Sequence, residues 1–306
     1  MECVLTVKQV LKRFLGVTAD VFIRASKVLP RRIEAHISIS PTIAAKFYPY
    51  RHESYVLLKP RIDVEMPCEN GLPIPPKEYW FPFMALAEEY LSSGRDHVEK
   101  MKRITEASGF SFREGKRILD FGCAAGRMLR WLKDDSKECE IWGVDIRAEL
   151  IAWCQRHLSP PFRFGTSTTF PHLPFEDGYF DLIYAGGVFT EISYLSDAWL
   201  LELRRVLAPG GKLYVTIHDR HSVDLILKFP PNHRLYWLKE LLLSFEQETH
   251  FMEADFAMFI TPRTSFLGPQ VFYDTHYFCQ NCEHFFKVLS VTPEAYWFLT
   301  AILLEK

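Results

Sequence analysis

Strand-like and helix-like segments alternate between residues 116 and 217, and this alternation limits the folds open to the chain more than any other feature. Short apolar runs typical of buried strands lie at 116–121, 140–144, 162–164, 179–184 and 212–217. Apolar residues at helical spacing lie between them, at 128–134, 148–157 and 199–207. Such alternation is typical of crossover units, in which helices cover both faces of a parallel sheet. The sequence therefore predicts an α/β fold with a doubly wound sheet.

The segments before this region predict a separate organisation. Residues 66–82 contain five prolines and one glycine, which favours a linker over a regular helix. Before the linker, the pattern predicts a helix at 4–15 and short strands at 33–39 and 54–58; after it, residues 82–108 have helical spacing. We therefore expect an N-terminal extension or small appended domain over 1–78 and a main domain over 79–306.

Composition excludes several function classes. The 306 residues are 48% hydrophobic and carry a net charge of -2, which favours a globular core and gives no general attraction to nucleic acid. No apolar run reaches the roughly 20 residues of a membrane span, and the first residues lack a signal-peptide pattern. Seven cysteines with irregular spacing favour reduced thiols. We expect a cytoplasmic protein. The first 66 residues hold eleven Lys or Arg against six Asp or Glu, so a solvated basic face and an anionic partner both stay open.

A run of small residues follows the first predicted strand. In RILDFGCAAGRM, Asp120 ends the strand and Gly122, Cys123, Ala124 and Gly126 form the turn into the next segment. Small side chains let the backbone turn tightly and let a ligand approach the amides. The alternative is that the glycines serve packing alone.

A second acid follows the neighbouring strand. Asp145 lies 25 residues after Asp120, at the end of EIWGVD. An acid at this strand tip is well placed to accept hydrogen bonds from two ribose hydroxyls. The alternative is an acid that stabilises a helix N-terminus through the helix dipole.

The region after these acids carries a family resemblance. LPF at 173–175, the pair Phe180 and Asp181, and LAPGG at 207–211 recur in this order after the glycine turn. The chain from 117 to 219 resembles the class I S-adenosylmethionine-dependent methyltransferases, specifically the type 11 and 12 methyltransferase-domain group. The resemblance implies a Rossmann-like sheet of seven strands that closes with an antiparallel C-terminal hairpin, here at 285–291 and 296–304, and makes 79–306 the methyltransferase domain.

The resemblance also implies roles for individual residues. Asp120 matches the acid that faces the ammonium of S-adenosylmethionine, and Asp145 matches the acid that holds the ribose. The remaining predicted cofactor contacts are Gly122, Cys123, Ala124, Gly126, Ile146 beside adenine, Thr166, Ser167 and Tyr184. Ala124 departs from the family, which has glycine there, and no acid follows the third strand.

Acceptor contacts are expected from the loops after the fourth and fifth strands. The predicted substrate-binding residues are Ala185, Gly186, Phe189, Glu191 and His221. His218 is the candidate general base, with Asp219 beside it. The alternative is that these polar residues cap the next helix.

The resulting hypothesis is an enzyme that transfers a methyl group to oxygen or nitrogen of a small molecule, with no metal, no nucleic acid and no membrane partner; a homodimer stays open. The rivals are a nicotinamide-dependent oxidoreductase and a non-catalytic methyltransferase-like partner protein, which Ala124 supports. HYFCQNCEH, at 276–284, has zinc-ligand residue types but favours a short helix begun by Thr275 as a cap. The aromatic stretch 250–274 suits a lid or substrate wall, a dimer contact or an extension of the core.

Overall fold

The chain is described by a computed structural model that covers residues 67–306 except 82, 193–194, 250 and 260–268. It also covers the backbone of two strands, β1 (Ala35–Ser40) and β2 (Ile43–Phe47). The helix expected at 4–15 and the strand expected at 54–58 lie outside the described residues. The strand expected at 33–39 corresponds to β1.

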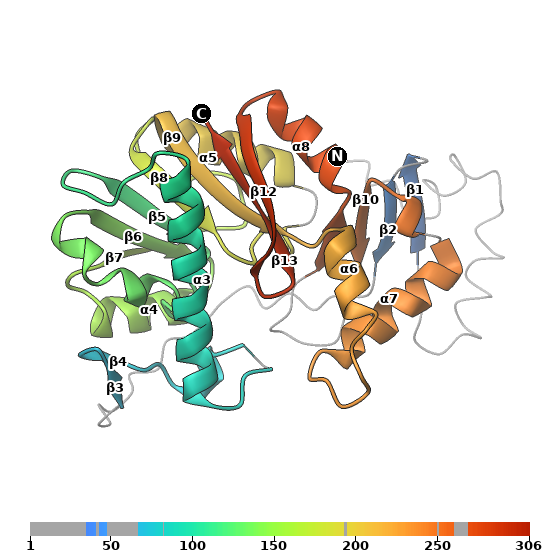
Figure 1. Cartoon of the computed structure of the whole chain (residues 1–306), viewed down its shortest axis with the longest axis horizontal. Helices are drawn as coiled ribbons and strands as arrows, with labels where there is room; N and C mark the ends of the chain where they lie inside the picture. Colours follow the sequence, from blue (N-terminus) through green and yellow to red (C-terminus); the bar gives the residue numbers. More distant parts are fainter. Residues whose placement is uncertain are drawn as a thin grey trace, which may run out of the picture.

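A seven-stranded sheet forms the centre of the molecule (Figure 1). Its order is β12 (Lys287–Tyr296), β13 (Leu299–Glu305), β9 (Leu207–Ile217), β8 (Phe180–Ala185), β5 (Arg117–Phe121), β6 (Glu140–Asp145) and β7 (Arg163–Thr166). The five strands from β9 to β7 are parallel, and β13 joins β9 antiparallel, as β12 joins β13. This arrangement confirms the predicted doubly wound sheet with its antiparallel closing hairpin.

Helices cover both faces because successive strand residues point to opposite sides. Ile118 belongs to the core beneath α3 (Ala87–Ala107) and α4 (Ala148–His157). Leu119 belongs to the core beneath α5 (Ser196–Val206) and α8 (Thr275–Glu283). Since both faces are buried, the strands are apolar on both sides.

The segment after the glycine turn differs from the prediction. The helix expected at 128–134 consists of 3-10 turns, with η2 at Leu129–Leu132 and η3 at Asp135–Lys137. Arg127, Met128, Leu129 and Arg130 are all buried, so four successive side chains point into protein. An amphipathic α-helix would leave part of such a run exposed. The tighter turns therefore replace a regular helix here.

Hydrogen bonds connect this segment and the glycine turn to their surroundings. The buried Arg130 donates to the carbonyls of Leu72 and Pro73 at 2.7 and 3.2 Å, and these bonds fix the proline-rich linker. The linker contains the strands β3 (Cys68–Glu69) and β4 (Leu72–Pro73) and the 3-10 turn η1 (Lys77–Tyr79). The Tyr90 hydroxyl on α3 donates to the Ala125 carbonyl at 3.3 Å. The linker and α3 are thus attached directly to the glycine turn.

A smaller sheet lies beside the first, at the right of Figure 1. Its order is β1, β2, β10 (Phe256–Phe259) and β11 (Gln270–Tyr273), and it packs with α6 (Arg220–Ile226), α7 (Tyr236–Thr249) and η4 (Phe251–Glu253). Strands from the predicted N-terminal extension therefore pair with strands from the aromatic stretch 250–274, so these two regions share one sheet.

Strand β11 connects this smaller sheet to the larger one. The Val271 amide donates to the Thr190 carbonyl at 2.8 Å, in the loop after β8, and the Tyr273 amide donates to the His218 carbonyl at 2.9 Å, just after β9. All four residues of β11 are buried. Strand β11 therefore contributes a wall at the carboxyl ends of β8 and β9, and a lid function of the stretch 250–274 stays a prediction.

Candidate functional site

The glycine turn after β5 has an unusual backbone. Gly122, Ala124 and Gly126 all have positive φ, at 83°, 47° and 75°. Glycine adopts this region freely, whereas a side chain costs about 1 kcal/mol there. A Cβ on Gly122 would lie 2.4 Å from Cγ2 of Val188, so glycine is required by space as well. Ala124 carries the strain that the family's glycine would avoid.

Asp145 reaches from the end of β6 to this turn. Its Oδ2 accepts from the Ala124 amide at 2.9 Å, and its Oδ1 accepts from the Arg147 amide at 2.8 Å. A carboxylate oxygen has two lone pairs, so each oxygen keeps one acceptor position. Burial raises the pKa of this carboxyl. Asp145 can therefore accept from two further hydroxyl groups.

Asp120 lies at the neighbouring strand end, opposite Tyr184 in the pairing of β5 with β8. Both side chains are buried. Burial raises the pKa of Asp120 to about 8, while the Arg127 guanidinium favours the charged form. A cationic ligand group at this point would favour the ionised carboxylate.

Glu191, in the loop after β8, faces the same region. Its side chain is exposed to solvent, yet surrounding protein raises the pKa of its carboxyl to about 7, and the negative charge of Asp145 adds to the shift. Asp145 and Glu191 therefore lie near each other at the carboxyl edge of the sheet. Ligands of such sheets bind in the crevice outside the carboxyl ends of the strands.

The remaining predicted cofactor contacts lie around this crevice. Ile146 is 56% exposed, and it follows Asp145 directly. The Ser167 amide donates to the Asp145 carbonyl at 2.9 Å, and Thr166 is exposed at the end of β7. Cys123 is buried, where burial raises the pKa of its thiol, so it serves packing beneath the turn.

Arg127 is a residue that sequence reasoning missed. It is 4% exposed, and its guanidinium contacts the Ser93 hydroxyl at 3.1 Å, the His97 Nδ1 at 3.1 Å and the Tyr296 hydroxyl at 2.5 Å. It also lies over the Trp297 ring at 4.9 Å. The only sequence signal is a basic residue directly after the last glycine of the turn, while its partners lie in α3 and the closing hairpin.

Two predicted acceptor contacts lie in the core. Ala185 and Phe189 are completely buried in the core beneath α5 and α8, so neither faces the crevice. Ala185 is the last residue of the buried β8, and Phe189 follows closely enough in sequence to share its core. Gly186 lies under the Tyr296 ring, since a Cβ there would be 2.6 Å from Cε2 of that ring. Among these loop residues, Glu191 is the one that solvent reaches most.

The candidate general base is enclosed. His218 is stacked between Phe272 and Phe298, with centroids 4.5 and 5.7 Å away, and its Nδ1 lies 3.2 Å from the Val271 carbonyl. Burial lowers its pKa to about 4, so the ring is neutral near pH 7. A base with such a low pKa takes a proton weakly.

Asp219 and His221 have other partners. Asp219 is the N-cap of α6: its Oδ1 accepts from the Ser222 amide at 2.9 Å, and its Oδ2 accepts from the Thr275 hydroxyl at 3.2 Å. This is the capping role that the sequence left open. His221 lies 2.9 Å from Glu294 of the closing hairpin.

The zinc-ligand residue types of HYFCQNCEH lie on α8 and at its end. The N-cap of this helix is Asp274, which accepts from the Tyr277 amide at 2.9 Å, and not Thr275 as predicted. Cys282 is buried in the core, and no group of three metal-ligating side chains occurs in the described part of the chain. Nor does that part contain a helix long and apolar enough to cross a membrane.

This geometry defines a class of domain: a parallel sheet with a glycine turn after the first strand, an acid at the tips of two adjacent strands, and an antiparallel closing strand. Residues 119–215 match the protein-family model described as "Methyltransferase domain". This part of the chain is a methyltransferase domain of the class I type, whose cofactor is S-adenosylmethionine.

Named relatives match over the same region. The chain is 32% identical over 133 residues to the ubiquinone/menaquinone biosynthesis C-methyltransferase UbiE of Neisseria gonorrhoeae, which covers 42% of this chain and 53% of the relative. It is 28% identical over 124 residues to a malonyl-[acyl-carrier protein] O-methyltransferase of Enterobacter lignolyticus, covering 40% and 47%. The chain thus spans about half the length of the curated relatives it matches. A solved SAM-dependent methyltransferase from Methanosarcina mazei is 19% identical, with a TM-score of 0.48 over 66% of this chain and 96% of that one.

The residues at the crevice fit S-adenosylmethionine. Asp145 keeps two acceptor positions for ribose hydroxyls, Ile146 offers an exposed apolar face for a base, and Asp120 offers a carboxyl to an ammonium group. Glycine at positions 122 and 126 removes side-chain bulk from the turn, whereas Ala124 at its centre keeps a methyl group.

Proposed function

We propose that this chain transfers a methyl group from S-adenosylmethionine to a small-molecule acceptor. The observation that carries the proposal is the placement of Asp120 and Asp145 at the ends of adjacent strands, on either side of a glycine turn, within the matched residues 119–215. The proposal concerns the whole chain, whereas the match concerns its central domain.

The chain contributes binding and orientation. S-adenosylmethionine supplies a methyl group that its sulfonium already activates. Asp120 holds the ammonium, Asp145 the ribose hydroxyls, and Ile146 packs against the adenine. Because the methyl group needs little further activation, holding donor and acceptor in line provides much of the rate.

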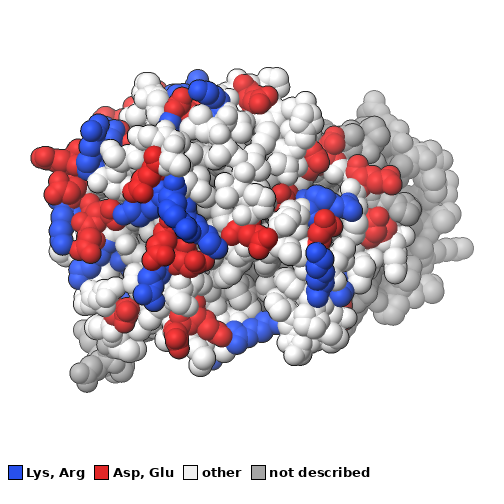
Figure 2. All heavy atoms as spheres, in the orientation of Figure 1, with Lys and Arg blue, Asp and Glu red and all other residues white. Residues whose placement is uncertain are grey.

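Two features favour a small acceptor. Basic and acidic side chains are interspersed over α3 and its neighbours on the face shown in Figure 2, as in the ion pairs of Lys100 with Asp96 and of Lys102 with Asp135. A nucleic-acid site would instead present a basic strip. Strand β11 also walls the carboxyl ends of β8 and β9.

The acceptor atom we propose is oxygen or nitrogen. Carbon is the alternative, because the relative from Neisseria gonorrhoeae is named a C-methyltransferase. A hydroxyl or amine acceptor must lose a proton, and Glu191 suits this step better than His218. Glu191 is reached by solvent, and its pKa of about 7 is close to physiological pH, whereas that of His218 is about 4. A homodimer stays a prediction.

Binding measurements separate this function from its rivals. Isothermal titration calorimetry is expected to show binding of S-adenosylhomocysteine and none of NAD. Binding of NAD instead would support an oxidoreductase. A chain that binds S-adenosylhomocysteine but transfers no labelled methyl group from S-adenosylmethionine to any compound of a cell extract would be a non-catalytic partner protein.

A further inference from the structure

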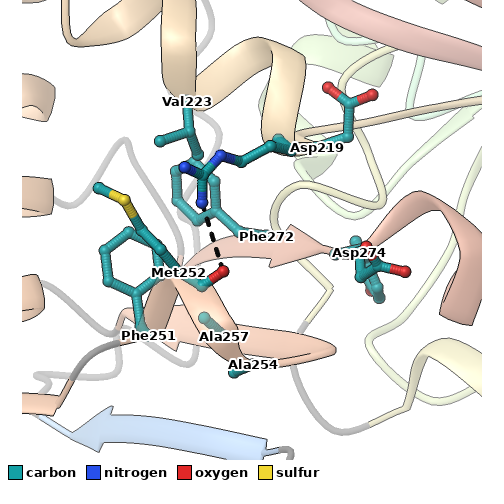
Figure 3. A pocket seen from close by; sticks show the side chains of 10 residues that line it. Asp219, Val223, Phe251, Met252, Ala254, Ala257, Phe272 and Asp274 are labelled. Atoms are coloured by element: carbon teal, nitrogen blue, oxygen red, sulfur yellow. Dashed lines mark hydrogen bonds between the residues drawn. The ribbon is translucent and has the colours of Figure 1, made fainter.

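A cavity of about 170 Å³ lies beside the end of β9 and shares no lining residue with the crevice around Asp145. The first turn of α6, the 3-10 turn η4, and strands β10 and β11 surround it. Figure 3 shows its lining side chains. We call it the β11 cavity.

The inner wall of the β11 cavity is apolar and aromatic. Val223, Phe251, Ala257 and Phe272 line it, and each is less than 5% exposed. The Phe251 and Phe272 rings lie at 63° to each other, with their centroids 6.3 Å apart. One face of Phe272 is stacked on His218, so a flat apolar group entering this space would pack against the remaining surface of these two rings, which favours a ring over a flexible chain.

The volume limits the size of the ligand. An apolar cavity of about 150 Å³ is large enough to bind benzene. The β11 cavity, at about 170 Å³, therefore accommodates one six-membered ring with a small substituent.

The charges at the rim oppose a charged ligand of either sign. Arg220 crosses from α6 to the Met252 carbonyl, at 3.4 Å, and its exposed guanidinium disfavours a cation (Figure 3). Asp219 and Asp274 lie at the opposite side, disfavour an anion, and direct their carboxylates away from the rings. Both carboxylates already accept hydrogen bonds as helix caps. A neutral hydroxyl group suits such a rim because it can both donate and accept.

We propose that the β11 cavity binds one neutral six-membered aromatic ring that carries a hydroxyl group. The ring packs against Phe251 and Phe272, and the hydroxyl lies at the rim beside Arg220. The site goes beyond the proposed methyl transfer and does not depend on it, because none of its lining residues belongs to the cofactor crevice.

The test uses the full chain labelled at its methionine and alanine methyl groups and titrated with phenol in solution NMR. Phenol is expected to shift the Met252 and Ala257 methyl signals and to show nuclear Overhauser effects to both, while Met101, a buried residue of α3, stays unchanged. Benzoate and benzylammonium, with the same ring and opposite charges, are expected to bind at least tenfold more weakly. Absence of contacts to Met252 and Ala257, or equal binding of either ion, overturns the proposal.

A variant adds a second test. Ala257→Leu fills the cavity and is expected to weaken phenol binding more than tenfold, whereas Ala148→Leu, the same change at the start of α4, leaves it unaltered. S-adenosylhomocysteine is titrated in parallel. Unchanged phenol binding by a folded Ala257→Leu protein contradicts the proposal, and the contacts in the wild-type chain decide the matter if that variant fails to fold. Failure of S-adenosylhomocysteine to bind the wild-type chain would contradict the proposed function alone.

Discussion

At the scale of single residues, Ala124 combines backbone strain with a hydrogen bond to an acid of the predicted cofactor site. Ala124 has a positive φ, and its amide is held by Asp145, the acid assigned to the ribose. The residue with the strained backbone is thus the one whose amide donates a hydrogen bond to Asp145. Ala124 stands where the family has glycine, and it still adopts the positive φ that glycine would adopt.

Ala124→Gly is expected to stabilise the protein by roughly 1 kcal/mol, because glycine removes the left-handed strain. Urea denaturation measures the change. Ala125→Gly is the matched control: Ala125 is completely buried and has no positive φ, so the same substitution should destabilise. Destabilisation by both changes would show that Ala124 is not strained.

Asp120 makes stability depend on pH. Its folded pKa of about 8 lies above the ordinary value near 4, so the folded chain retains a proton that the unfolded chain releases. Stability therefore falls as pH rises from about 4 towards 8. Asparagine imitates the protonated acid, so Asp120→Asn should equal the wild-type protein near pH 4 and exceed it by a few kcal/mol near pH 9. Thermal unfolding without cofactor measures this; a constant difference across pH would contradict it.

At the scale of elements, the close approach of α3 to the glycine turn fixes the crevice from one side. A Cβ on Gly94 would lie 2.3 Å from the Arg127 carbonyl oxygen, so only glycine permits this packing. The cost of glycine inside a helix, about 1 kcal/mol, is outweighed by the contact it allows.

Gly94→Ala should therefore destabilise the protein by about 1–3 kcal/mol, although alanine is the better helix former. Gly165→Ala is the control, since its nearest neighbour would lie 3.8 Å away in ordinary contact. Chemical denaturation of both variants compares them. A stabilising Gly94→Ala would mean that α3 shifts without cost.

Arg127 links three elements: the turn, α3 and the closing hairpin. Arg127→Gln should lower stability by about 2–4 kcal/mol, because charged hydrogen bonds are lost inside the protein. Arg156→Gln, at an exposed position of α4, should change it by less than about 0.5 kcal/mol. Similar losses in both variants would argue against the linking role of Arg127.

Sequence patterns predicted those elements that depend on the spacing of apolar residues close together in the chain. The predicted helix 148–157 matches α4, and the two strand-tip acids are neighbours because β5 pairs with β6. The pattern failed at 128–134, where the helical spacing is present but the polar side chains of Arg130 and of the preceding Arg127 are buried as well, and 3-10 turns form. It missed Arg127 because the Tyr296 partner is 169 residues away, and it placed Ala185 and Phe189 in the site because distance along the chain does not separate core from crevice.

At the scale of the whole molecule, the N-terminal strands and the stretch 250–274 depend on each other. Strand β2 pairs with β10 in parallel, so removal of residues 1–66 leaves an edge of β10 without its partner. An unpaired strand edge promotes self-association. A chain that starts at residue 67 should therefore elute as larger species in size-exclusion chromatography with light scattering, and a monodisperse monomer would contradict this dependence.

The position of Tyr296 has a consequence for biosynthesis. The ribosome makes Arg127 169 residues before the tyrosine that receives its hydrogen bond. At ordinary elongation speeds this is a delay of roughly 10–30 s. During that interval the guanidinium of a nascent chain has Ser93 and His97 but lacks Tyr296 and Trp297, so a chain that ended before the closing hairpin would leave this buried charge only partly paired.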